Sequence, residues 1–306
     1  MNSASHRLLA ALLGLALPLA AQAGGRAECL ELPSQILHHA VRYCVLLPPS
    51  YEAETTRRYP VLYYLHGLGD DEQSLVSFGG MYLVEDLREQ GQLGEFLIAT
   101  PDGGTSFYIN SHDGRQRYED FLIREFFPWI ERHYRVRAGR AHRGITGVSM
   151  GGYGALRLAF RYPQLFGAAS AHSAALIEKL PDVRTPRAAP SSAMRILGSV
   201  FGLPPDPEFW ERNSPFTFAK ENKLAGLKIY FDCGTEDQYG FDAGARALDG
   251  LLKSRDVPHE FHLYPGGHGW SYVAEHISAS LEFHSRTFGR APNARGRPRK
   301  KVDRAH

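Results

Sequence analysis

The sequence contains few cysteines and no long apolar segment, and each shortage excludes a class of protein. Three cysteines among 306 residues cannot supply the dense disulfide framework of a small secreted scaffold. The main apolar run, residues 8–20, is shorter than the roughly 18 apolar residues of a membrane-spanning helix. No cluster of His, Cys, Asp or Glu has the spacing of metal ligands, so we expect no metal and no cofactor. With 43% hydrophobic residues, the chain can instead form one large globular core.

The first 23 residues have the order of features found in a secretory signal peptide. His6 and Arg7 give a weakly basic start, residues 8–20 form an apolar core, and Ala21-Gln22-Ala23 is a small-x-small cleavage site. We therefore expect an exported protein, secreted or periplasmic, with residues 24–289 as its folded domain.

Positive charge is concentrated at the end of the chain. Residues 290–306 hold seven Lys or Arg side chains and one Asp, although the whole chain has a formal net charge of only +2. We interpret this segment as a disordered basic tail that attaches weakly to anionic envelope surfaces. Arg295-Gly296-Arg297-Pro298 does resemble the core of an AT-hook, which binds the DNA minor groove. Export and the mildly acidic remainder of the chain argue against nucleic acid as a partner.

The cysteines differ in their expected roles. Cys29 and Cys44 lie in the first two extended segments of a chain that we expect to be exported, so either a disulfide or two free thiols is compatible with the sequence. Cys233 follows an expected strand and is interpreted as a buried, inert thiol.

Apolar segments typical of buried strands alternate with segments of helical periodicity. Strands are expected within residues 35–48, 59–65, 96–100, 142–146, 166–171, 227–232 and 259–264. Helices are expected at residues 81–90, 118–134, 150–162, 243–253 and 272–288. This alternation predicts an α/β fold with a doubly wound, mostly parallel sheet.

A proline-rich insertion interrupts this rhythm before the penultimate strand. Residues 175–225 carry seven prolines, with short helical pieces near 192–201 and 207–212. Its apolar side chains either line an acyl or aryl pocket or pack the insertion against the body; they are Met194, Ile196, Phe201, Phe209, Trp210, Phe216 and Phe218.

The segment Gly147-Val148-Ser149-Met150-Gly151 matches the Gly-x-Ser-x-Gly pattern of a nucleophile elbow. In that motif the serine lies on a sharp turn between a strand and a helix, and the flanking glycines avoid clashes across the turn. An expected strand precedes the motif and an expected helix follows it. Ser149 is therefore the candidate nucleophile.

A nucleophilic serine needs a base and an acid that orients the base. His268 follows the last strand in a glycine-rich loop, and Asp237 follows the strand before it, which is the chain order of this fold. His172 is the rival base, since it also follows a strand. Asp232 and Glu236 are alternatives to Asp237, although Asp232 lies in or at the end of the strand and is interpreted as structural.

The oxyanion of the reaction needs two hydrogen-bond donors. The backbone N–H of Met150, next to the nucleophile, is the first candidate. Leu68 N–H, in the His66-Gly67-Leu68-Gly69 loop after the first buried strand, is the second. His66 itself is interpreted as a structural anchor of that loop.

Together these motifs resemble the esterase D-like family of α/β-hydrolases. The segments that carry the resemblance occur in the family's order over roughly residues 35–288; they are His66-Gly67-Leu68-Gly69, Pro101-Asp102-Gly103-Gly104, Gly147-Val148-Ser149-Met150-Gly151-Gly152, Gly234-x-x-Asp237 and Gly267-His268. That family includes S-formylglutathione hydrolases, feruloyl and acetylxylan esterases, and mycolyltransferases. The resemblance implies an α/β-hydrolase fold with Leu68 and Met150 as oxyanion donors. It implies nothing about the basic tail.

We therefore predict an exported serine carboxylesterase with a Ser149–His268–Asp237 triad, acting on a small-molecule or carbohydrate-linked ester. An acyltransferase that replaces water with an alcohol or sugar is the alternative, and the sequence does not separate the two. A non-catalytic binding module is disfavoured because all three triad positions are intact. Export argues against S-formylglutathione hydrolase, whose substrate is cytosolic.

Overall fold

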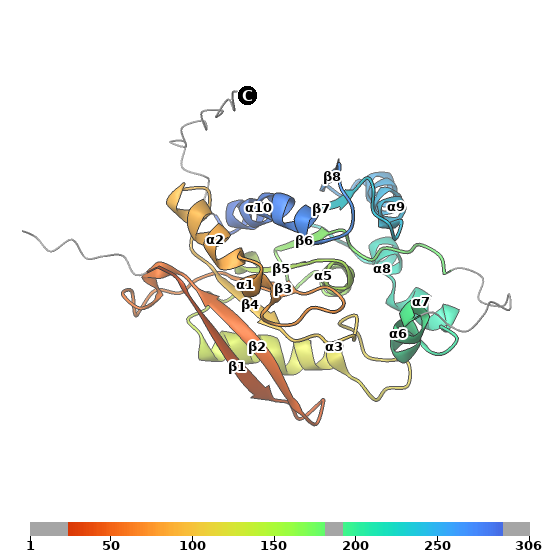
Figure 1. The fold of residues 1–306 in the computed structure, drawn as a ribbon, viewed down its shortest axis with the longest axis horizontal. Coiled ribbons are helices and arrows are strands. Elements are labelled where there is room, and N and C mark those ends of the chain that lie inside the picture. Colours follow the sequence, from red (N-terminus) through yellow and green to blue (C-terminus); the bar gives the residue numbers. More distant parts are fainter. Residues whose placement is uncertain (1–23, 181–191, 290–306) are drawn as a thin grey trace, which may run out of the picture.

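One eight-stranded sheet organises the domain in the computed structural model, which describes residues 24–180 and 192–289 (Figure 1). The strand order is β1-β2-β4-β3-β5-β6-β7-β8. The two pairings that involve β2 are antiparallel, and all others are parallel. The strands are β1 Arg26–Pro33, β2 Ala40–Leu47, β3 Val61–Leu65, β4 Leu97–Pro101, β5 Arg143–Gly147, β6 Ala168–His172, β7 Lys228–Gly234 and β8 Glu260–Tyr264. The predicted signal segment and basic tail lie outside the described residues.

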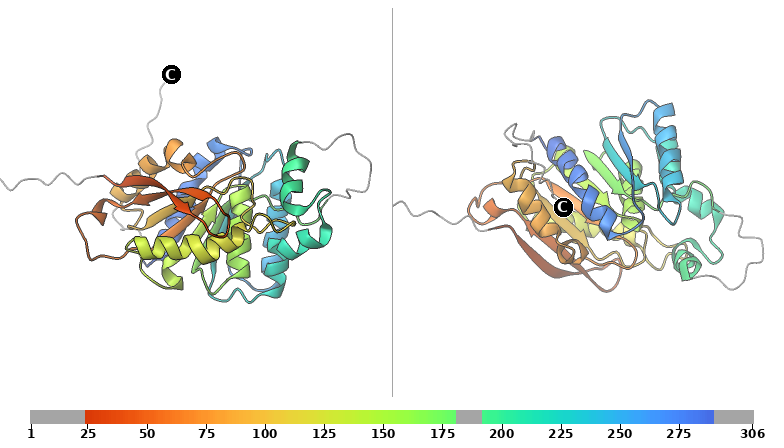
Figure 2. Two further views of the ribbon diagram at one scale, coloured as in Figure 1. Left: turned by 90° about the horizontal axis from the view of Figure 1, so that it is seen from below. Right: turned by 45° about the horizontal axis from the view of Figure 1, so that its top comes forward.

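Helices cover both faces of the sheet, as the two views of Figure 2 show. On one face lie α2 (Gly80–Glu89) and α10 (Trp270–Thr287), next to the short α1 (Ser74–Ser77). On the other lie α3 (Tyr118–Phe121), α4 (Phe127–His133), α5 (Met150–Arg161), α8 (Pro215–Glu221) and α9 (Phe241–Ser254). The predicted doubly wound sheet is confirmed.

Strand β3 shows why a continuous apolar run forms a strand here. Successive side chains of a strand point to opposite faces, so a strand covered on both sides must be apolar throughout. Val61, Tyr63 and Leu65 belong to the core beside α5, whereas Leu62 and Tyr64 belong to the core beside α2 and α10. Two buried layers therefore meet at this strand.

The first hairpin differs from the sequence expectation. Residues 35–48 were expected to be strands, but β1 ends at Pro33 and residues 35–39 form the turn before β2. The side chain of Glu125 accepts hydrogen bonds from the backbone N–H groups of Gln35 (3.0 Å) and Ile36 (3.1 Å). The turn is thus held by a residue about 90 positions further along the chain. The pattern of apolar and polar residues within 35–48 cannot reveal such a contact.

The expected helix 118–134 is present, with one irregularity. Leu122–Phe126 form a π-helical turn between α3 and α4. Pro128 follows at the start of α4 and has no N–H to donate, which interrupts the regular α-helical ladder there.

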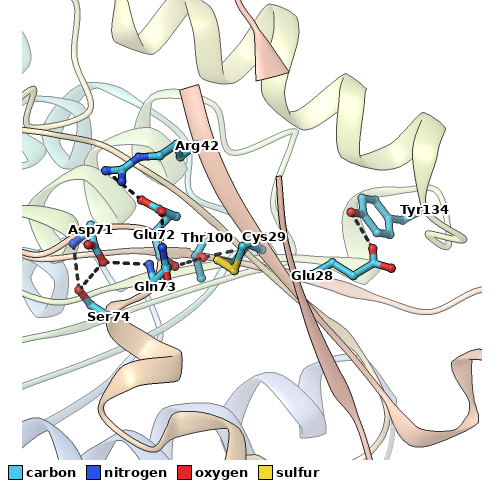
Figure 3. Close-up of a disulfide and its surroundings, with 10 residues drawn as sticks. Glu28, Cys29, Arg42, Asp71, Glu72, Gln73, Ser74, Thr100 and Tyr134 are labelled. Atoms are coloured by element: carbon cyan, nitrogen blue, oxygen red, sulfur yellow. Dashed lines mark hydrogen bonds and ion pairs between the residues drawn. A yellow bond between two sulfur atoms is a disulfide. The ribbon is translucent and has the colours of Figure 1, made fainter. Parts of the chain in front are cut away.

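A disulfide joins Cys29 to Cys44, which face each other across the β1–β2 pair (Figure 3). The alternative of two free thiols therefore does not hold. Beside it, Tyr134 donates a hydrogen bond of 3.2 Å to Glu28, so β1 is tied to both its neighbouring strand and the end of α4. Cys233 is free and buried, as expected.

In the described part of the insertion, three helices separate β6 from β7: α6 (Ser192–Phe201), α7 (Pro207–Asn213) and α8. Phe201, Trp210 and Phe216 are buried in the main core, and Phe201 and Trp210 pack around Tyr153 of α5. These aromatic side chains attach the insertion to the body. The side chains of Met194 and Ile196 lie outside the described part of the chain.

Candidate active site

The elbow has the backbone that its sequence predicts. Ser149 has φ 54° and ψ −115°, an unfavourable conformation for a residue with a side chain, and it joins β5 directly to α5. A Cβ atom placed on Gly147 would lie 2.3 Å from the carbonyl carbon of Gly151. A Cβ on Gly151 would lie 1.9 Å from the carbonyl oxygen of Leu65. Both glycines are therefore required for the turn to close.

The side chains of Ser149, His268 and Asp237 form one line of hydrogen bonds. Ser149 Oγ lies 2.9 Å from His268 Nε2, and His268 Nδ1 lies 2.8 Å from Asp237 Oδ2. The three residues come from the loops that follow β5, β8 and β7, at the carboxyl edge of the sheet. With the proton on Nδ1 shared with Asp237, Nε2 is free to accept the hydroxyl hydrogen of Ser149.

The Asp237 carboxylate is held as an anion. Burial opposes its ionisation, but the hydrogen bonds from His268 and from the Tyr239 backbone N–H (2.9 Å) outweigh burial, so its pKa lies below the ordinary value. The Cys233 thiol adds a weak donor 3.6 Å from Oδ2. An ionised carboxylate at this position can hold an imidazole in one tautomer.

The rival residues have other partners. Asp232 is buried and accepts hydrogen bonds from Tyr230 (2.9 Å) and Tyr272 (2.8 Å), and its carboxylate lies 2.8 Å from Nδ1 of His172. Nε2 of His172 lies 2.7 Å from the Ser280 hydroxyl inside the core. The pKa of Asp232 is lowered, because the charge and hydrogen bond of His172 and the two tyrosine hydroxyls outweigh burial.

His66 anchors the loop that carries Leu68. Its Nδ1 donates to the carbonyl oxygen of Gly67 (2.8 Å) and its Nε2 accepts from the backbone N–H of Gly103 (2.7 Å), so its ring is neutral with the proton on Nδ1. Among the described residues, neither Leu68 N–H nor Met150 N–H has a hydrogen-bond partner. Both amides thus remain available as donors.

A cavity of about 160 Å³ opens at Ser149, bordered by Leu68, Asp70, His268 and Trp270. The Trp270 ring stacks on Phe78 at 4.2 Å between ring centres, and its indole N–H lies 3.3 Å from the Asp70 carboxylate. Sequence reasoning missed Asp70, Phe78 and Trp270, although Trp270 follows the candidate base by two residues and Asp70 follows the oxyanion loop.

Two further aromatic rings stand beside His268. Tyr239 and Phe241 meet the imidazole edge-on at 4.9 and 5.3 Å between ring centres, and Tyr239 is largely exposed. Aromatic side chains from the loop after β7 and the start of α9 therefore pack against His268, beside a cavity that is open to the surface.

Residues 24–180 and 192–289 contain neither a candidate membrane span nor a candidate metal cluster. No helix there combines the length and apolar character needed to cross a bilayer. No group of three or more His, Cys, Asp or Glu side chains in these ranges has an arrangement that could hold a metal ion.

A sheet of this order with an elbow after β5 defines an α/β-hydrolase fold. Residues 34–284 match the family model described as "Putative esterase", and the chain belongs to that esterase family. An esterase of Mycobacterium tuberculosis is 32% identical over 245 residues, which cover 73% of this chain and 51% of the relative. The chain thus spans about half the length of that relative. An acetyl esterase of Caldicellulosiruptor saccharolyticus is 28% identical, covering 74% of this chain and 83% of the relative.

Solved structures of esterases share the fold. A ferulic acid esterase superposes with a TM-score of 0.75 at 28% identity, covering 87% of this chain and 99% of that one. An S-formylglutathione hydrolase from Agrobacterium tumefaciens superposes with a TM-score of 0.70 at 18% identity, covering 87% of this chain and 96% of that one.

Proposed function

We propose that this protein is an exported serine carboxylesterase in which Ser149 is the nucleophile, His268 the general base and acid, and Asp237 the residue that orients His268. The observation that carries the proposal is the line of hydrogen bonds from Ser149 Oγ through His268 to Asp237. Membership of the esterase family supports the same chemistry.

The geometry supports a two-step reaction. Ser149 Oγ bonds to the ester carbonyl carbon while its proton passes to His268 Nε2, and the resulting oxyanion accepts hydrogen bonds from Leu68 N–H and Met150 N–H. The carbon–oxygen bond to the alcohol then breaks, and His268 returns the proton to the leaving oxygen. In the second step, water gives a proton to His268 Nε2 while its oxygen bonds to the acyl carbon. The bond between that carbon and Ser149 Oγ then breaks, and His268 returns the proton to Oγ.

The cavity supports a small-molecule or carbohydrate-linked ester as the substrate. Trp270, which stacks on Phe78, borders the opening, so a flat or apolar acyl group can lie against the Trp270 ring. The similarity to a ferulic acid esterase and to an acetyl esterase directs the first substrate panel to feruloyl and acetyl esters. A rise in ester product on addition of a second alcohol would instead assign an acyltransferase.

The Cys29–Cys44 disulfide supports export, because disulfides persist in oxidising compartments and are rare in the cytosol. We propose residues 24–289 as the catalytic domain and residues 290–306 as the basic tail that binds anionic envelope surfaces. Fractionation of cells that express the full chain tests the location.

Replacement of the nucleophile tests the central assignment. Ser149→Ala removes the attacking oxygen and is expected to lower turnover of a chromogenic acetyl ester by about 10⁴-fold or more, with an unchanged melting temperature. A fluorophosphonate probe should label the wild type and not the variant. Labelling that persists in Ser149→Ala would show that another residue is the nucleophile.

A further inference from the structure

The loop after β7 contacts His268 twice. Asp237 meets the imidazole, and the next residue, Gln238, meets the main chain of the same histidine. Gln238 Oε1 accepts a hydrogen bond from the backbone N–H of His268 (2.9 Å), and Gln238 Nε2 donates one to its carbonyl oxygen (3.1 Å). A single side-chain amide therefore satisfies both polar groups of the His268 backbone.

The histidine loop has little stiffness of its own, because glycines at 266, 267 and 269 surround His268. Gly266 has φ 134°, a conformation that other residues rarely adopt. Its carbonyl oxygen accepts from the Glu236 backbone N–H (2.9 Å), which fixes the start of the loop but not His268. No backbone–backbone hydrogen bond reaches His268 from the described residues, so the Gln238 amide supplies the attachment at the histidine itself.

We infer that Gln238 is a positioning residue for the reaction, an inference that rests on the proposed role of His268 as the base. Asp237 fixes which imidazole nitrogen carries the proton and how the ring is rotated. Gln238 fixes the position of the His268 Cα, from which the side chain extends, since it binds the peptide groups on either side of that atom. Both constraints are needed to keep Nε2 at 2.9 Å from Ser149 Oγ.

Two substitutions separate this role from simple loop stability. Gln238→Met keeps the length of the side chain and removes both hydrogen bonds. We expect kcat to fall by about 10- to 100-fold with KM little changed, because a small displacement of the base slows the chemistry and not the binding. Gln238→Glu keeps an acceptor for His268 N–H but places carboxylate oxygen against the His268 carbonyl. We expect a smaller loss of kcat than in Gln238→Met. We also expect the acidic limb of the pH profile of kcat/KM to move to higher pH, since a nearby negative charge favours the imidazolium form of His268.

Fluorophosphonate labelling distinguishes a change in the reactivity of Ser149 from a loss of folded protein. The labelling rate reports the reactivity of Ser149 in folded molecules, whereas its final extent reports how many molecules are folded. A slower rate at full extent supports positioning. A reduced extent at the wild-type rate would mean that Gln238 only stabilises the loop, and would overturn the inference.

Two controls complete the series. Glu236→Gln changes an exposed neighbour whose side chain makes no hydrogen bond or ion pair with a described residue, and should leave kcat and the labelling rate unchanged. His268→Gln tests the proposed function itself. If His268→Gln is inactive while Gln238→Met turns over as fast as the wild type, the positioning role of Gln238 is wrong and the base assignment stands. If His268→Gln is active, the base assignment fails.

Discussion

Two aspartates lie five residues apart after the middle of β7, and their hydrogen-bond partners give them different roles. Asp232 is enclosed by Tyr230, Tyr272 and His172, whereas Asp237 meets His268 at the edge of the sheet. The first holds the core together behind the elbow. In the proposed triad, the second acts through the imidazole of His268, to which it is hydrogen-bonded.

Substitution by asparagine separates these roles. Asp237→Asn keeps the shape but favours the wrong imidazole tautomer, and is expected to lower kcat by about 10⁴-fold with little change in stability. Asp232→Asn is expected to lower the free energy of unfolding more than it lowers kcat, because it leaves buried donors without an anion. Steady-state kinetics and urea unfolding of both variants check this. High activity in Asp237→Asn together with an inactive, folded Asp232→Asn would show that the acid is Asp232.

Sequence patterns identify residues that a motif constrains and miss those defined by a contact. Ser149 is predictable because Gly147 and Gly151 must flank it at fixed spacing, and His268 because it follows the last expected strand in a glycine-rich loop. Asp237 required a choice among three carboxylates. Gln238 carries no sequence signal, since its importance comes from two hydrogen bonds to a residue 30 positions further along the chain.

At the scale of elements, buried parallel strands were predicted to within two residues at each start, because both of their faces are apolar. Strand β1 was expected only as an extended segment around Cys29, and its bounds were not predicted. Its residues are mostly exposed and alternate charged with apolar side chains, as in an edge strand, so its pattern resembled a polar leader. The π-helical turn at Leu122–Phe126 was also missed, because the apolar periodicity of residues 118–134 does not show the backbone hydrogen bond that Pro128 cannot donate.

The disulfide makes the β1–β2 hairpin a testable element. Cys29→Ala with Cys44→Ala opens a loop of about 15 residues and is expected to lower the free energy of unfolding by about 3 kcal/mol. Turnover should be preserved, because β1 lies four strands from β5 in the sheet. Urea unfolding with and without dithiothreitol measures the effect, and wild-type protein that is equally stable in both conditions would contradict it.

At the scale of the whole molecule, a buried histidine links the stability of the fold to pH. His284 of α10 is fully buried, its Nε2 lies 2.9 Å from Ser170 Oγ, and its Nδ1 has no hydrogen-bond partner among the described residues. A Cβ on Gly144 would lie 2.6 Å from that Nδ1, so the imidazole packs directly against the backbone of β5. Burial, together with the charge of His172, lowers the pKa of His284 to about 3.

Unfolding should therefore become easier as the solution is acidified. The folded protein keeps His284 neutral, whereas the unfolded chain protonates it below about pH 6.5. Its contribution is complete above pH 6.5 and is lost at about 1.4 kcal/mol per pH unit as the pH falls toward 3. His284→Gln does not titrate and should flatten the stability profile between pH 6.5 and 4.5 in urea titrations. Equal slopes for the two proteins would contradict this, and the lowered pKa values of Asp232 and Asp237 act only below this window.

The close approach of Gly151 to the Leu65 carbonyl has a consequence for how such an enzyme can diversify. Leu65 leads directly into the loop of Leu68, so the contact between the Gly151 and Leu65 backbones sets the distance between Ser149 and the proposed oxyanion donor Leu68. The rings of Phe78, Trp270 and Tyr239 take no part in that contact. Mutation can therefore change the rim while the reactive geometry is inherited intact.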